Sequence, residues 1–253
     1  MKRIAGSFAK AKAENRGAFV AFLTIGHPTL EESERAADAL IAGGADIIEL
    51  GVPFSDPFAD GGVIRAAACR ALENGVSLDD AIALAKRLRA RHPETGLVLF
   101  SYYNPVFSKG ADAFADALAD AGIDAALIVD LPLEEREELL PALRAKNVGF
   151  VPLIAPNTPI ERVKKSAEGI GDGFLYAITV KGTTGERAEL PADLAGRLDA
   201  IRAAVPVPVA AGFGISTRAQ AAEVSRHADG FIVGSAIVRK LDAGESLADG
   251  ILP

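Results

Sequence analysis

The chain has 253 residues, of which 49% are hydrophobic, so it can bury one sizeable core and has the size of a single α/β barrel. Its 27 basic and 34 acidic residues give a net charge of −7, and no stripe of Lys and Arg with interleaved aromatic residues occurs, so a nucleic-acid partner is not expected. The single cysteine excludes a disulfide framework and a thiolate metal cluster; we expect Cys69 to be a small core residue and predict no metal site.

The first residues, from Met1 to Ser7, lack the apolar run of a signal peptide, and no apolar stretch reaches the length of a membrane span. No Gly/Ser-rich tether divides the chain. We therefore expect a cytoplasmic protein in which residues 1–253 form one domain, without a membrane partner.

Short apolar runs alternate along the chain with longer amphipathic or Ala-rich stretches, which is the pattern of a parallel sheet covered by helices. The expected strands, in chain order, are 19–24, 46–49, 97–101, 125–129, 149–153, 173–179, 207–210 and 230–233. A helix is expected after each strand, and an additional helix at 78–91. Eight such units without a break predict an α/β fold of the closed (β/α)8 (TIM) barrel class, with function gathered in the loops after the strands.

The segment from Ile47 to Gly61 runs out of the second expected strand and carries two acidic residues in unlike surroundings. Glu49 lies in an apolar run, where desolvation should raise its pKa, whereas Asp60 lies in a Gly-flanked loop and should stay ionised. Such a pair suits proton-transfer chemistry. The alternatives are that Glu49 faces solvent at a strand end and that Asp60 caps a helix beginning near Gly62.

Glycine-rich segments follow the last three expected strands, at 181–185, 211–216 and 233–236. Barrels often bind phosphate where the loops after strands seven and eight meet a short helix, because glycine lets backbone N–H groups approach the anion. These segments predict a phosphorylated substrate. Each segment alone is also compatible with a plain turn, with Ser235 as a helix N-cap.

The motif Glu49-Leu-Gly-Val-Pro53-Phe-Ser-Asp56-Pro57 with Ala59-Asp60-Gly61 resembles the signature of the tryptophan synthase α subunit family. The resemblance extends in order over nearly the whole chain, through the segments 17–20, 102–104, 130–132, 184–185, 212–216 and 234–238. It implies retro-aldol cleavage of indole-3-glycerol phosphate to indole and glyceraldehyde 3-phosphate, without a cofactor in this chain.

The same resemblance implies roles for individual residues. Glu49 would protonate indole C3 and then take the side-chain hydroxyl proton, and Asp60 would stabilise the positive charge at N1–H and take its proton. The implied substrate contacts are Phe22, Tyr102, Tyr176, Thr184 and Phe213. The implied phosphate-binding residues are Gly185, Gly214, Gly234 and Ser235. Ile64, Phe100, Leu127 and Ile154 would add apolar walls, although any barrel core requires such residues, and Tyr176 could equally be a core aromatic.

The segment 180–190 corresponds to a lid in this family, with Val180 where some members carry an arginine, so an ion pair from that position would be absent. His27 stands where the family more often has aspartate. A single histidine without a ligand cluster is weak support for catalysis, and we expect it on the loop face.

The resemblance also implies a partner, a pyridoxal-phosphate β subunit that receives indole in an αββα heterotetramer. The family uses five of the matching loop positions for this contact, namely Pro53, Asp56, Pro57, Asn104 and Pro132. Without the resemblance these are turn residues.

Three other functions remain open on the sequence. A free-standing lyase would release indole without a β subunit. A non-catalytic activating subunit is disfavoured because Glu49 and Asp60 are both present, and a phosphate-sugar isomerase would need a different acid–base pair.

Overall fold

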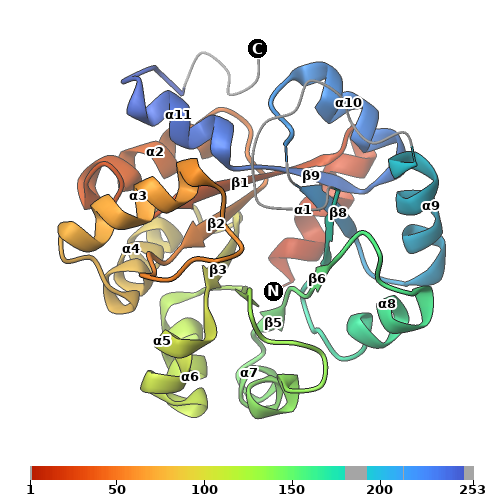
Figure 1. Cartoon of the computed structure of the whole chain (residues 1–253), viewed down its shortest axis with the longest axis horizontal. Coiled ribbons are helices and arrows are strands. Elements are labelled where there is room, and N and C mark those ends of the chain that lie inside the picture. The colour runs from red at the N-terminus through yellow and green to blue at the C-terminus, as the bar shows by residue number, and fades with distance from the viewer. Residues whose placement is uncertain (1, 180–192, 213, 248–253) are drawn as a thin grey trace.

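The computed structural model describes residues 2–179, 193–212 and 214–247. Nine parallel strands form one sheet that curls around the centre of the molecule (Figure 1), in the order β5-β4-β3-β2-β1-β9-β8-β7-β6. The strands are β1 Ala18–Thr24, β2 Ile47–Gly51, β3 Gly96–Ser101, β4 Ala125–Ile128, β5 Gly149–Phe150, β6 Leu153–Ile154, β7 Leu175–Ile178, β8 Val209–Gly212 and β9 Gly230–Val233. The first strand pairs with the last, with Ala18 opposite Gly230, as a barrel requires.

The fifth expected strand is divided into β5 and β6, and this is why nine strands appear where eight were predicted. Pro152 interrupts it, because proline has no N–H to donate to a ladder. Val151 N still donates to Ala126 O at 2.9 Å, and Pro152 O accepts from Tyr176 N at 3.1 Å, so this segment joins β4 to β7 and closes the ring. The other seven strands lie where the sequence predicts them, with ends that differ by at most two residues.

Helices cover the outside of the sheet (Figure 1). They are α1 Arg3–Ala13, α2 Leu30–Ala42, α3 Gly62–Glu73, α4 Leu78–Arg91, α5 Tyr103–Lys109, α6 Ala111–Ala121, α7 Leu140–Ala145, α8 Ile160–Ala167, α9 Leu194–Ala204, α10 Arg218–His227 and α11 Ser235–Asp242, with a 3-10 turn at Arg136–Glu138. The additional helix expected at 78–91 is α4, and it begins at a capping box in which the Ser77 and Asp80 side chains each bond the other's backbone N–H. The closed α/β barrel is therefore confirmed.

The core has two layers, one inside the barrel and one between the sheet and the helices. Inward-facing strand residues such as Val20, Val98 and Ala210 fill the interior. Ile4 and Phe8 of α1 belong to this inner cluster, so α1 closes the end of the barrel where the strands begin. The opposite end, where the strands finish, is left for a site.

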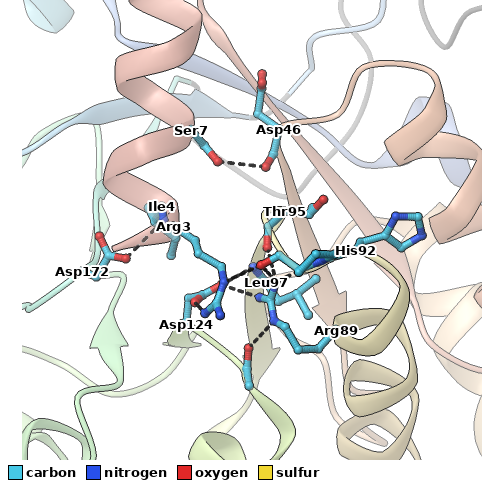
Figure 2. A network of polar contacts seen from close by, with 12 residues as sticks. Arg3, Ile4, Ser7, Asp46, Arg89, His92, Thr95, Leu97, Asp124 and Asp172 are labelled. Carbon is cyan, nitrogen blue, oxygen red and sulfur yellow. Dashed lines mark hydrogen bonds and ion pairs between the residues drawn. The ribbon is translucent and has the colours of Figure 1, made fainter. Parts of the chain in front are cut away.

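Polar contacts hold α1 against the strand beginnings, as Figure 2 shows. Asp124, whose side chain is 4% exposed, accepts from Arg3 at 2.9 Å, from Arg89 at 2.7 Å and from the backbone N–H of Leu97 at 2.9 Å. Asp172 accepts from the N–H of Ile4 at 3.2 Å, at the start of α1. The buried Asp124 carboxylate therefore has three donors, which offset the cost of removing its charge from water.

Cys69 lies on the exposed side of α3, so its expected place in the core is wrong. The Ala-rich surroundings that suggested a buried helix face extend around α3, and only Ile64, Ala67, Ala68 and Ala71 turn inward. Within the described ranges, no helix combines the length and the apolar character needed to cross a membrane.

Replacement of Asp124 tests this network. Because Asp124→Ala leaves two arginines and a strand N–H without their acceptor, we expect the free energy of unfolding to fall by about 3–5 kcal/mol, measured by urea denaturation. Asp116→Ala, which removes an exposed partner of Lys146, is the matched control and should leave the midpoint unchanged. Equal midpoints for the two variants would contradict the account.

Candidate active site

Glu49 lies in the middle of β2, between Phe22 of β1 and Val98 of β3 in the ladder register. Its side chain lines a pocket inside the barrel mouth, and the residue is 1% exposed. Neither carboxylate oxygen has a hydrogen-bond partner among the described residues. Burial alone raises the pKa of Glu49 from 4.5 to about 8. The solvent-facing alternative is therefore wrong, and Glu49 is held as a neutral acid at neutral pH.

Asp60 lies in the loop between β2 and α3 and also lines this pocket. It is 7% exposed, and its Oδ2 accepts a hydrogen bond from the Tyr102 hydroxyl at 3.1 Å. Burial raises the pKa of Asp60 from 3.8 to about 6, while the Tyr102 hydroxyl and the charge of Arg65 oppose the rise. The loop folds inward over the barrel, so Asp60 is more buried than its Gly-flanked position in the sequence suggested. Asp60 remains ionised above about pH 6.

The alternative in which Asp60 caps α3 is also wrong. Gly61 is the N-cap of this helix, and no side chain caps it. The Asp60 carboxylate is thus available to the pocket.

Tyr176 of β7 stands across the pocket from β2, and it is 7% exposed. Burial, followed by the charges of Glu49 and Asp60, raises the pKa of Tyr176 well above its ordinary value, so its hydroxyl stays protonated. A Cβ on Gly212 would lie 2.3 Å from this hydroxyl, so only glycine leaves room for the tyrosine there. Tyr176 is both a core aromatic and a pocket residue.

Aromatic and aliphatic side chains form the walls between the acids. Phe22 and Phe100 pack edge to face with their ring centres 5.1 Å apart. A Cβ on Gly51 would lie 2.6 Å from the Phe22 ring, so the glycine fixes where this ring stands. Ile64 of α3 completes this side. A flat apolar ring system suits these walls.

Described residues of two glycine-rich segments, 211–216 and 233–236, reach the same pocket. Gly214, with φ of +85°, Gly234 and Ser235 line it, together with Ile215 and Ala236. Gly234, rather than Ser235, is the N-cap of α11, so the alternative with Ser235 as the cap is wrong. The first turn of α11 presents backbone N–H groups and the positive end of its dipole at this pocket. The site therefore combines two acids, apolar walls and an anion-binding end.

Other predicted residues lie elsewhere. Tyr102 does not line this pocket but a small cavity beside it that shares Asp60. Neither Leu127 of the barrel interior nor Ile154 of the outer cluster lines this pocket. Thr184, Gly185, Phe213 and the segment 180–190 with Val180 lie outside the described residues.

His27 is buried rather than on the loop face, being 1% exposed. Its Nε2 lies 3.3 Å from Asp242 Oδ1 at the end of α11. Burial lowers the pKa of His27, so it is neutral at neutral pH. His27 thus packs between the loop after β1 and the end of α11, and this structural role does not require it to take part in catalysis.

The five residues assigned to a partner contact divide into two groups. Asp56 and Pro132 are exposed on loops after the strands and Asn104 is exposed in the first turn of α5, whereas Pro53 and Pro57 are buried. The sequence did not single out Phe58 and Phe107, whose exposed fractions are 68% and 69%. Phe58 follows Asp56 and Phe107 follows Asn104 within three residues, but the sequence does not show that an apolar ring at these positions faces solvent.

The comparisons with known proteins agree with this geometry. Residues 8–250 match the sequence model of the family described as "Tryptophan synthase alpha chain". A protein of that name from Zymomonas mobilis is 44% identical over 238 residues, which cover 94% of this chain and 86% of the relative. A Mycobacterium tuberculosis tryptophan synthase structure is 34% identical, with a TM-score of 0.87, and covers 99% of this chain and 98% of that chain. A structure of the α2β2 tryptophan synthase complex from Pyrococcus furiosus is 37% identical, with a TM-score of 0.84, and covers 92% of this chain and 93% of that chain.

The buried state of Glu49 predicts how stability depends on pH. Because the folded-state pKa of Glu49 lies above its ordinary value, its contribution to stability is full below about pH 4.5 and is lost as the pH rises toward 8. Glu49→Gln removes this loss. We expect the free energy of unfolding of Glu49→Gln minus that of wild type to grow between pH 5 and 8, by at most about 1.4 kcal/mol per pH unit.

Urea unfolding at several pH values measures this difference. Glu161→Gln, an exposed glutamate of α8, is the control and should show a constant difference from wild type. A constant difference for Glu49→Gln as well would contradict the burial of an uncompensated carboxyl.

Proposed function

Because the chain belongs to the tryptophan synthase α chain family, we propose that Glu49 and Asp60 are the acid–base pair of that family's reaction. The chain is a carbon–carbon lyase that cleaves indole-3-glycerol phosphate to indole and glyceraldehyde 3-phosphate, in the last steps of L-tryptophan biosynthesis. One observation carries the assignment: a fully buried, unpaired glutamate faces the same pocket as an aspartate of lower pKa.

Glu49 is the proton donor to indole C3. It is protonated at neutral pH, since its pKa is raised to about 8, and C3 is a weak base that needs a positioned acid. After this transfer the ionised carboxylate takes the proton of the side-chain hydroxyl. The C–C bond then breaks, the hydroxyl carbon becomes the aldehyde, and the bonding electrons return to the indole ring. Glu49 ends in its starting state.

Asp60 serves the other end of the ring. Protonation at C3 puts positive charge on N1–H, which an ionised carboxylate at the same pocket stabilises. Asp60 takes the N1 proton and returns it when the electrons come back to the ring. The apolar walls of Phe22, Ile64 and Phe100 exclude water and strengthen these interactions. Tyr176 and, through Asp60, Tyr102 complete the substrate contacts.

The phosphate of the substrate is assigned to the glycine-rich end. Gly214, Gly234 and Ser235 line the pocket, and the first turn of α11 offers N–H donors and a favourable dipole. Gly185, with Thr184 and Phe213 as substrate contacts, belongs to the same proposal on the strength of the family resemblance. Backbone N–H donors suit the phosphate group of indole-3-glycerol phosphate.

The partner is the tryptophan synthase β subunit in an αββα heterotetramer, and pyridoxal phosphate belongs to that subunit. We place the contact surface at the barrel mouth, on the exposed residues Asp56, Asn104 and Pro132 with Phe58 and Phe107. Two exposed phenylalanines beside turn residues are typical of an interface. Pro53 and Pro57 are buried, so they would shape the loop rather than touch the partner.

The cellular setting and the domain organisation are also proposals. A biosynthetic enzyme family and a chain with one cysteine support a reducing, cytoplasmic location. All nine described strands belong to one sheet, which supports a single domain over residues 1–253.

The pH dependence of indole release tests the acid–base assignment. The reaction needs Asp60 ionised and Glu49 protonated, so kcat/KM should rise with pH through about 6 and fall through about 8. We expect Asp60→Asn to lose the acid limb, and Glu49→Gln to lower kcat by about 10²–10⁴-fold. A profile without limbs, or a Glu49→Gln variant with wild-type kcat, would contradict the roles.

The same assay, run with and without a β subunit, decides between the partnered enzyme and a free-standing lyase. Slow release that the β subunit increases supports the partnership. Fast release that the β subunit leaves unchanged favours the free-standing lyase, and release by neither preparation contradicts the lyase assignment itself.

A further inference from the structure

Thr24 is the last residue of β1, opposite Gly51 of β2. It lies on the same face of the strand as Val20 and Phe22, which point into the barrel. The residue is 3% exposed, yet its hydroxyl oxygen has no hydrogen-bond partner among the described residues. A buried hydroxyl without a partner costs about 1–3 kcal/mol. A hydrogen-bond partner for the Thr24 hydroxyl is therefore expected at the barrel mouth.

The hydroxyl lines a small cavity beside the main pocket. The cavity has a volume of about 10 Å³, close to the space that one water molecule needs. The polar side chains among its described lining residues are Thr24, Asp60 and Tyr102, and the remaining side chains are apolar. A water molecule requires two to four polar partners, and these three residues supply them.

We propose that Thr24 holds an ordered water molecule in this cavity and that this water is a second hydrogen-bond partner of the Asp60 carboxylate, beside Tyr102. The inference rests on the proposed role of Asp60. Tyr102 already donates to Oδ2, and its hydroxyl also accepts from the N–H of Ala59 at 3.2 Å. With both partners in place, the carboxylate is fixed in one orientation, and an oxygen is left for the indole N1–H in the main pocket. Thr24 is thus a positioning residue.

The charges around Asp60 set the direction of the effect. Arg65 of α3 and Tyr102 favour the ionised form, whereas Glu49 of β2 is neutral at the pH of interest and Tyr176 of β7 stays protonated. Burial is the largest influence and disfavours the ionised form. Loss of a donating water therefore makes the carboxylate harder to ionise.

The isosteric Thr24→Val removes the hydroxyl and keeps the shape, while Thr24→Ser keeps the hydroxyl and is the matched control. We expect the acid limb of kcat/KM for indole release to move to higher pH by about one pH unit in Thr24→Val and to stay in place in Thr24→Ser. A crystal structure of the wild-type chain at high resolution should show a water between Thr24 and Asp60. Thermal unfolding of both variants checks that they fold.

Three results would overturn the inference: wild-type density without this water, an acid limb that does not move in Thr24→Val, or a limb that moves equally in Thr24→Ser. Failure of the proposed function looks different, because the wild-type chain would then release no indole under any condition. If Thr24→Val does not fold, the wild-type density still decides whether the water exists.

Discussion

The burial of an uncharged Glu49 is the constraint on which the rest of the structure depends. A carboxyl that is 1% exposed and lacks a hydrogen-bond partner among the described residues cannot keep its charge at neutral pH, so its pKa is raised to about 8. A surface carboxylate would be useless as a proton donor to carbon at pH 7. The barrel supplies this environment by burying β2 along its whole length and by lining its mouth with aromatic side chains.

An unpaired polar group in the core costs stability. Paired aspartates at the other end of the barrel offset this cost. Three aspartates that directly precede β2, β4 and β9, namely Asp46, Asp124 and Asp229, each accept the N–H of a residue on a neighbouring strand, at 2.8 Å, 2.9 Å and 3.0 Å. Arginines pair with all three carboxylates. The strand beginnings thus carry paired carboxylates, whereas the strand ends carry Glu49, whose carboxyl has no partner among the described residues. This division separates stability from chemistry within one fold.

Much of the fold could be predicted from the sequence, because apolar runs with regular spacing fix where parallel strands lie. The division of the fifth strand could have been expected from Pro152, but periodicity does not show where a strand loses its partner. Glu49 was recognised as a buried acid since the residues around it in β2 are apolar. The burial of Asp60 was not predicted, because a loop that looks polar in sequence folds back over the barrel, and only the tertiary contact with Tyr102 shows this. The exposure of Cys69, Phe58 and Phe107 and the burial of His27 likewise depend on which face packs, which local sequence does not encode.

The central claim is that Glu49 is a neutral acid at physiological pH, and direct titration of its carboxyl tests that claim. Infrared difference spectra of wild type and Glu49→Gln, recorded from pH 4 to 9, isolate the stretching band of this one protonated carboxyl. The account predicts a band that persists at pH 7 and disappears with a midpoint near 8. A midpoint near 4.5, the ordinary value for glutamate, would contradict it and with it the assignment of the proton donor.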